Sequence, residues 1–159
     1  MKKEHTYHIG LHWTGNQGQG TRNYKAYQRS YTVSVEGKPD IHGSSDPLYR
    51  GDKSKYNPED LFLASIASCH MLWYLHLCAD AGITVHEYLD QTSGTVRNNA
   101  DGSGHFIDVT LHPRVGLENL EHESLATQLH QEANKFCLIA NSCNFVIRHK
   151  PTFFLSNNK

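Results

Sequence analysis

Hydrophobic and polar residues alternate in the first part of the chain, as they do in strands that bury one face. Residues 6–12 and 31–35 follow this period of two, and the turn-forming residues 36–39 end the second run. Residues 40–56 are polar and rich in Gly, Ser, Asp and Pro, so they predict a surface loop. The first third of the chain is therefore expected to consist of strands and loops.

A long apolar run comes next and predicts a helix. Asn57 suits the N-cap, Pro58 is tolerated in the first turn, and Gly82 suits the C-terminal end. Residues 61–79 contain no Lys, Arg, Asp or Glu, which matches the length of a membrane span. Ser, His and Tyr residues interrupt the run and no basic flank orients it, which favours a central helix buried on nearly all sides.

The second half of the chain predicts further strands. Residues 83–96 and 105–115 are expected to pair as a hairpin, because the turn-forming residues 97–104 separate them. Apolar residues at 145–147 and 152–155 predict closing strands with a proline between them.

A second helix is expected from Asn119 onward, between the hairpin and the closing strands. Its inward face is predicted by a spacing of four residues: Leu125, Leu129, Ala133 and Cys137. The length of 159 residues fits one compact domain, so a single domain is expected over residues 1–159.

Composition narrows the classes of function. The 159 residues are 38% hydrophobic, and 15 Lys and Arg balance 16 Asp and Glu, so the chain is expected to fold and has no net charge that would attract nucleic acid or a membrane surface. The glycines within 15–20 lack the Gly-Lys-Ser/Thr ending of a phosphate-binding loop.

Residues 1–12 lack the apolar stretch of a secretory signal, so a cytoplasmic protein is expected. In that compartment 4 Cys are too sparse for a disulfide framework.

The 12 His and 4 Cys raise the question of a metal site. Cys69, His70, His76 and Cys78 lie on the predicted long helix, but no two of them are three or four residues apart, as ligands on one helix must be. Cys69 and His76 share a face, yet seven helical residues separate them by roughly 10 Å. The other histidines are scattered, as surface or hydrogen-bonded core histidines are. We therefore expect no metal and no other cofactor.

Cys69 taken alone is most simply a small core side chain, but its neighbours favour another role. The run Asn57-Pro58-Glu59-Asp60-Leu61-Phe62-Leu63-Ala64-Ser65-Ile66-Ala67-Ser68-Cys69 resembles the NPE-L-x-A-x-x-A-C segment of the OsmC/Ohr family of osmotically inducible and organic hydroperoxide resistance proteins. The run Lys135-Phe136-Cys137-Leu138-Ile139-Ala140-Asn141-Ser142 resembles the second cysteine segment of that family.

The resemblance implies both a fold and an activity. The fold would be α+β, with antiparallel sheets, a long buried central helix and a second helix, in an intertwined homodimer with two active sites at its interface. The activity would be reduction of organic hydroperoxides, with Cys69 as the peroxidatic thiol, Cys137 as the resolving thiol and a lipoyl-type dithiol as reductant. This chemistry needs two cysteines that meet, because the second thiol must condense with the sulfenic acid of the first before further oxidation.

Glu59 matches the family's carboxylate by its offset from Cys69. Ten helical residues span about 15 Å, so Glu59 cannot serve the Cys69 of its own chain directly, and an active role would require it to reach across a dimer interface. The alternative is that Glu59 only favours the helix N-terminus, and both can hold.

An arginine is expected to support the Cys69 thiolate, because it stays charged in an apolar pocket. The family's arginine positions fall on no Arg here, which leaves Arg22, Arg29 and Arg50 as candidates. We favour Arg50 because it lies in the polar loop just ahead of the long helix; the alternative is a solvated surface charge.

Two departures from the family pattern suggest a subfamily of its own. His70 follows Cys69 where an aromatic residue often stands, and Leu138 replaces the usual proline after Cys137. Cys78 is half a turn out of phase with Cys69 and is expected in the core, whereas Cys143 is either a packing residue or an alternative resolving thiol.

The function predicted from the sequence is thus a cytoplasmic, homodimeric thiol peroxidase acting on organic hydroperoxides. Its alternative is a non-catalytic protein of the same fold that binds a small ligand or senses redox state. A metal-binding module is a third, weaker alternative.

Overall fold

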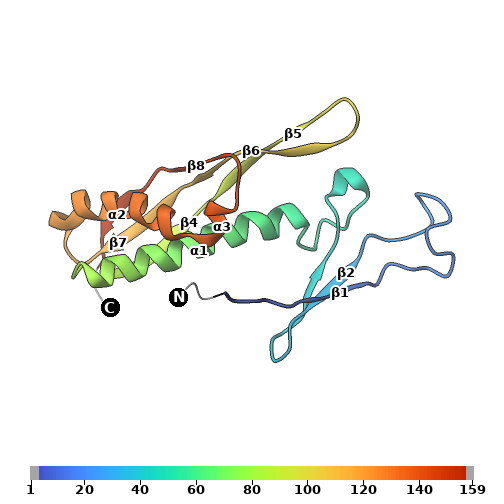
Figure 1. Cartoon of the computed structure of the whole chain (residues 1–159), viewed down its shortest axis with the longest axis horizontal. Helices are drawn as coiled ribbons and strands as arrows, with labels where there is room; N and C mark the ends of the chain where they lie inside the picture. The colour runs from blue at the N-terminus through green and yellow to red at the C-terminus, as the bar shows by residue number, and fades with distance from the viewer. Residues whose placement is uncertain (1–3, 157–159) are drawn as a thin grey trace. The chain divides into compact units, whose positions relative to one another are not determined.

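The computed structural model describes residues 4–156; residues 1–3, where the sequence argument about a secretory signal begins, and residues 157–159 lie outside it. The chain divides into two compact units, Met1–Leu61 and Phe62–Lys159, and each is described by itself. Figure 1 shows the elements in chain order. The single domain expected over the whole chain stays a prediction.

The N-terminal unit contains one antiparallel three-stranded sheet. Its strands, in spatial order, are β1 (Gly10–Trp13), β2 (Tyr31–Ser34) and β3 (Ile41–Gly43). The two alternating segments of the sequence thus form strands, each shorter than predicted. The segment 40–56 is not only a loop, since it contains β3 and the 3-10 helix η1 (Pro47–Tyr49). A strand of three residues is too short to show a period in the sequence.

The long helix α1 (Pro58–Asp80) confirms the predicted start and end signals. The Asn57 side chain accepts a hydrogen bond from the Asp60 N–H at 2.7 Å, and the Asp60 carboxylate accepts one from the Asn57 N–H at 3.1 Å. This reciprocal pair is a capping box, which satisfies two backbone donors. After the helix, Gly82 has φ 71°, a left-handed conformation that glycine adopts without strain.

Within the single chain, α1 is less enclosed than its composition predicts. The buried residues recur every four positions: Ile66, His70, Tyr74 and Cys78. Leu72, in contrast, is 63% exposed. By length and composition alone the helix could cross a membrane, a test that the core helices of soluble proteins also pass. One chain therefore covers one face of α1 and leaves apolar surface on the other.

The C-terminal unit contains two three-stranded sheets. The first is ordered β4 (Val85–Asp90), β7 (Pro113–Leu117), β9 (Thr152–Leu155), and the second β5 (Ser93–Asn98), β6 (Gly104–Leu111), β8 (Val146–His149). β5 and β6 form the predicted hairpin, and β4 pairs antiparallel with β7. The closing strands β8 and β9 pair in parallel with β6 and β7, so both sheets are mixed.

Each of the two long strands predicted in this half breaks into two. The first is interrupted after Asp90 and the second at His112. The Asp90 carboxylate accepts hydrogen bonds from the His112 N–H at 2.8 Å and from the Thr92 hydroxyl at 3.1 Å. This contact fixes both interruptions at the same place. Beyond its interruption, each chain segment continues as a strand of the other sheet.

The second helix α2 (Glu123–Phe136) begins after the 3-10 helix η2 (Leu120–His122), later than predicted, and is followed by the short helix α3 (Leu138–Asn141). Its buried face consists of Ala126, His130, Ala133 and Cys137. Leu125, expected to point inward, is 41% exposed. A strict spacing of four residues drifts by about 40° per step around a helix of 3.6 residues per turn, so Leu125 lies outside the buried face. The small Ala126 lies in the core cluster with residues of α1 and β7.

Candidate redox site

Two of the residues predicted to act together, Cys69 and Cys137, lie together in the C-terminal unit. Cys69 is half-buried on α1, Cys137 is fully buried at the end of α2, and both thiols are free. The Cys137 thiol lies beside that of Cys69. Burial, and after it this contact, raises the pKa of Cys137 to about 11. Cys137 is therefore a protonated thiol at neutral pH.

A break between two helices places the Cys137 thiol. Cys137 follows the last residue of α2 in an extended conformation, and its sulfur accepts a hydrogen bond from the Ala140 N–H at 3.4 Å, so it caps α3. Leu138 is the first residue of α3, a position where proline is favoured but other residues fit equally well. Leucine at position 138 is therefore compatible with this helix start. Nearby, the Trp73 and Phe136 rings stack at 5.0 Å.

The remaining thiols are in packed surroundings. Cys78 is 1% exposed in the core cluster, as predicted. Cys143 is half-buried, packs against the second core cluster around Ile66, and donates to the Ile139 carbonyl at 3.3 Å. Burial raises the pKa of both thiols. These contacts favour a packing role for Cys143 over a resolving one.

Glu59 belongs to the N-terminal unit, at the second residue of α1. One carboxylate oxygen, Oε2, is buried and has no hydrogen-bond partner among the described residues. The Tyr31 hydroxyl is also buried without a partner in this part of the chain. Burial, and then the negative charges of Glu59 and Asp60, raises the pKa of Tyr31. Glu59 therefore has a free acceptor oxygen that suits a cationic partner.

Two of the three candidate arginines line one cavity of about 240 Å³ in the N-terminal unit. Its lining is polar: Gln28, Arg29, Ser30, Ser44, Arg50, Gly51 and Asp52. Arg29 is held between the rings of Tyr24 and Tyr27, each 4.2 Å from the guanidinium carbon, and donates to the carbonyls of the same two residues at 2.6 Å. Arg50 is exposed, with φ 66°, and ends η1. Arg29 is thus held by its neighbours, whereas the Arg50 side chain is free to reach a ligand. Arg22, the third candidate, is exposed in the preceding loop.

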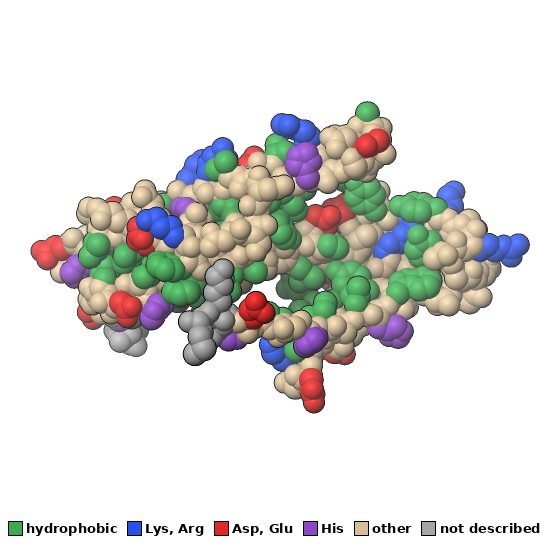
Figure 2. Space-filling view, in the orientation of Figure 1, with side chains coloured by type: hydrophobic (Ala, Val, Ile, Leu, Met, Phe, Trp, Pro, Cys, Tyr) green, Lys and Arg blue, Asp and Glu red, His purple; other side chains and the backbone are tan. Residues whose placement is uncertain are grey.

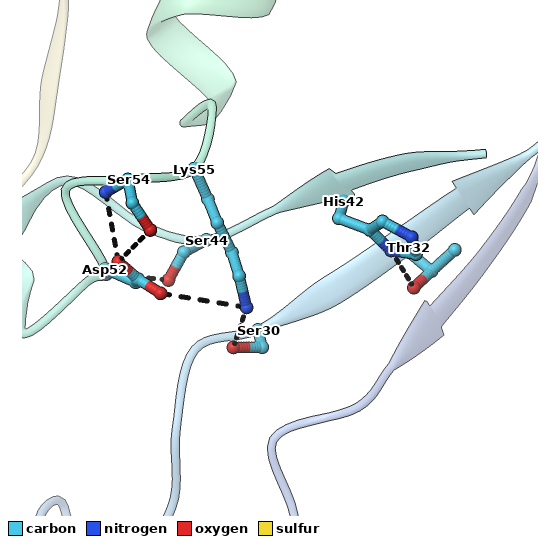
Figure 3. Close-up of polar contacts among 7 residues, drawn as sticks. All are labelled: Ser30, Thr32, His42, Ser44, Asp52, Ser54 and Lys55. Atoms are coloured by element: carbon cyan, nitrogen blue, oxygen red, sulfur yellow. Dashed lines mark hydrogen bonds and ion pairs between the residues drawn. The ribbon is translucent and has the colours of Figure 1, made fainter. Parts of the chain in front are cut away.

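A network of hydrogen bonds stiffens the wall of this cavity (Figure 3). Lys55 donates to the Ser30 hydroxyl at 3.0 Å and lies 3.8 Å from the Asp52 carboxylate. The Asp52 N–H donates to the Ser44 hydroxyl at 3.0 Å. Hydrogen bonds from Ser54, followed by the charge of Lys55, lower the pKa of Asp52. The charges of Lys55 and Asp52 offset each other, so the arginines supply the excess positive charge of the cavity.

Three histidines that are far apart in the sequence lie together in the C-terminal unit. His70 Nε2 lies 2.9 Å from His130 Nδ1, and the His149 ring stacks on His70 at 4.4 Å. Within residues 4–156, no group of three or more His, Cys, Asp or Glu side chains has a geometry that could hold a metal ion. A sequence signal for this cluster exists in retrospect, since His70 shares the four-residue spacing of the buried face of α1.

Comparisons with known proteins concern the family and the fold of the chain. The model of a family described as OsmC-like protein matches residues 51–150. No curated protein matches the chain. An OsmC-like protein of unknown function from Vibrio cholerae has a similar structure, with a TM-score of 0.80 at 24% identity over 95% of this chain and 100% of that one.

Two further solved structures are described as organic hydroperoxide resistance proteins. The one from Elizabethkingia anophelis has a TM-score of 0.67 at 20% identity and covers 97% of this chain and 100% of its own. The one from Legionella pneumophila, also described as a predicted redox protein, has a TM-score of 0.68 at 17% identity and covers 96% of this chain and 98% of its own. At these identities the likeness establishes a shared fold.

Proposed function

Because the chain belongs to the OsmC-like family, we propose that it is a thiol peroxidase that reduces organic hydroperoxides to alcohols. Membership of this family indicates a redox or peroxide-related function. The observation that carries the more specific proposal is the contact between two free thiols from different helices, Cys69 and Cys137. Similarity in fold to organic hydroperoxide resistance proteins supports it.

The reaction begins at Cys69, the more accessible of the two thiols. Its thiolate attacks the outer peroxide oxygen, so that an S–O bond forms, the O–O bond breaks and the substrate leaves as an alcohol after protonation. Cys69 is thereby oxidised to the sulfenic acid. Cys137, protonated and buried until then, condenses with it to form the disulfide and release water. Its raised pKa keeps Cys137 from competing with Cys69 for the peroxide.

A dithiol reductant of the lipoyl type returns the disulfide to two thiols and is itself oxidised to a disulfide. On the substrate side, the apolar residues that follow on α1 suit an alkyl hydroperoxide better than hydrogen peroxide. Leu72 is 63% exposed and Trp73 is half-buried. The proposal places this cycle in the cytoplasm, where reductants keep such thiols reduced.

We further propose that the active form is a homodimer in which Glu59 and Arg50 of one chain serve the Cys69 of its partner. The helical distance of about 15 Å between Glu59 and Cys69 excludes direct contact between them within a chain. The unpartnered buried oxygen of Glu59 supports a role beyond favouring the helix terminus. Hydrophobic side chains also reach the surface of the molecule (Figure 2). On the helices of the C-terminal unit, those exposed are Leu72, Leu125, Phe136 and Leu138.

The test is a peroxidase assay with a dithiol reductant that compares cumene hydroperoxide, hydrogen peroxide and no peroxide. We expect turnover of cumene hydroperoxide by the wild-type protein, none by Cys69→Ser, and wild-type turnover by Cys143→Ser, a matched control at a half-buried thiol outside the pair. If Cys69→Ser consumes the peroxide as fast as the wild type, the mechanism is wrong.

Mass spectrometry after one equivalent of peroxide identifies the bond that forms. A Cys69–Cys137 disulfide is expected, and a Cys69–Cys143 disulfide instead would contradict the resolving role of Cys137. Formation of the Cys69–Cys137 disulfide in one turnover, without continued consumption of peroxide when dithiol is present, would favour the redox-sensing alternative.

A further inference from the structure

Two buried histidines and a half-buried one, from three different elements, come together at the helix that carries Cys69. His70 of α1, His130 of α2 and His149 of β8 form, with Tyr74, an assembly that we name the histidine stack. The His70 and His130 rings are joined edge to edge, with Nε2 of the first 2.9 Å from Nδ1 of the second and ring planes 7° apart. His149 stacks on His70 with ring centroids 4.4 Å apart, and Tyr74 stacks on His130 at 3.8 Å.

Both joined rings are neutral in the folded protein. His70 and His130 are each 1% exposed, and burial, followed by the neighbouring imidazoles, lowers the pKa of each to about 3. A neutral imidazole has one N–H and one lone pair, so one ring donates to the other. The two outer nitrogens, His70 Nδ1 and His130 Nε2, are buried and have no hydrogen-bond partner in the part of the chain that the structure describes.

Burying the histidine stack in the core destabilises the folded state relative to apolar side chains of similar volume. A buried polar atom without a partner destabilises the folded state, whereas an apolar side chain of similar volume carries no such cost. What a hydrogen bond adds is direction, because it weakens steeply with misalignment, while apolar packing tolerates small shifts. The hydrogen bond between His70 and His130 therefore acts on the register of α1 against α2 more than on net stability.

That register decides whether the two thiols meet. Cys69 directly precedes His70 on α1, and Cys137 lies two helical turns beyond His130 on α2. The Cys69–Cys137 contact and the Tyr74–His130 contact come in opposite order along the two helices, so α1 and α2 run antiparallel. A slide of α2 along α1 would break the histidine hydrogen bond and separate the two sulfurs at the same time.

We propose that His70 and His130 are positioning residues for closure of the Cys69–Cys137 disulfide, an inference that rests on the proposed peroxidase function. In this step the sulfur of Cys137 bonds to the sulfur of Cys69, the S–O bond of the sulfenic acid breaks, and the oxygen leaves as water with the thiol proton of Cys137. The peroxide has already supplied the oxidising equivalents. The histidine stack contributes by holding the sulfurs at reacting distance.

Two matched pairs of amide substitutions test the proposal. The amide of asparagine occupies the place of a histidine Nδ1, and that of glutamine occupies the place of Nε2. His130→Asn and His70→Gln therefore keep a hydrogen-bonding group at the joined nitrogen, whereas His130→Gln and His70→Asn move it away. Within each pair the chemical group is the same, so the cost of burying an amide is matched.

The experiment mixes each reduced protein rapidly with cumene hydroperoxide and follows sulfenic acid formation and disulfide closure separately by trapping and mass spectrometry. We expect His130→Asn and His70→Gln to close the disulfide within about twofold of wild type, and His130→Gln and His70→Asn to close it about fivefold more slowly, as the loss of one hydrogen bond predicts. Sulfenic acid formation is expected to stay within twofold of wild type in all four variants.

The discriminating result is that the faster-closing variant is Asn at position 130 but Gln at position 70. A role in packing alone would rank the closure rates of Asn and Gln by side-chain volume, in the same way at each position. The same order at both positions, or closure at the wild-type rate in all four variants, overturns the proposal. If one pair does not fold, the following measurement on the wild-type protein decides. In the wild type, imidazole nitrogen chemical shifts that show no hydrogen-bonded pair overturn it independently. Failure of the wild type to form a sulfenic acid at Cys69 refutes the proposed function instead.

Discussion

Acid is expected to destabilise this protein through its buried imidazoles. In the unfolded chain His70 and His130 bind protons below their ordinary pKa of 6.5, but in the folded chain only near pH 3. Between these values the unfolded state binds more protons, so the free energy of unfolding falls as the pH falls. The stability that neutral rings allow is fully present above pH 6.5 and is lost between pH 6.5 and about 3.

The size of the effect follows from the two pKa values. At pH 5 each ring lies 1.5 pH units below its unfolded pKa, and at 1.36 kcal/mol per unit this costs about 2 kcal/mol per ring, or about 4 kcal/mol for the pair. The groups that face the pair are His149 and Tyr74. Burial also lowers the pKa of His149, which adds to the loss in the same direction.

The measurement is guanidinium unfolding of the reduced protein at pH 8 and pH 5, at one protein concentration so that any dimerisation affects both equally. The double variant His70→Gln/His130→Asn removes both titrating rings, and we expect it to lose about 4 kcal/mol less than wild type between the two pH values. His76→Gln is the control, because His76 lies on the same helix with 59% of its side chain exposed. A double variant that loses as much stability as wild type would refute the reasoning.

Three further outcomes are expected. Asn57→Ala removes the N-cap of α1 and should lower the free energy of unfolding by about 1 kcal/mol in denaturant titration. Arg50→Ala should reduce peroxidase turnover with the melting temperature unchanged, whereas Arg29→Ala should lower the melting temperature, because it removes two charge-assisted hydrogen bonds and two cation–π contacts. Asp90→Ala leaves the buried His112 N–H without its acceptor, at an expected cost of about 1–3 kcal/mol by the same titration.

The sequence predicts the parts of the fold that local physics controls. The N-cap residue Asn57, the charge-free run of α1 and the turn before β6 are signals within a few residues, and each formed the expected element. The pairing of β8 with β6 and of β9 with β7 in parallel is a property of segments far apart in the chain. No period in the local sequence predicts this parallel pairing, and antiparallel sheets were therefore expected.

The same distinction between local and long-range features applies to the candidate site. Cys69 and Cys137 could be paired from the sequence through family resemblance, and the geometry brings their thiols into contact. The contact among His70, His130 and His149 could not be predicted, because the three residues lie on three elements that are far apart in the sequence. Two local signs mark the environment of His70: its departure from the family pattern and its place in the four-residue spacing of the buried face of α1.

The sulfur of Cys137 also serves as the cap of α3, and this ties oxidation state to backbone order. To bond to the sulfur of Cys69, the Cys137 sulfur must turn toward it, so oxidation withdraws a weak acceptor from the Ala140 N–H. Four residues are too few for α3 to be stable by itself, so the loss of its side-chain cap weakens its first turn. Oxidation at a fully buried sulfur would therefore loosen the segment that begins at Leu138. Because Leu138 is 66% exposed, the oxidised protein would be cleaved by a protease in this segment faster than the reduced protein.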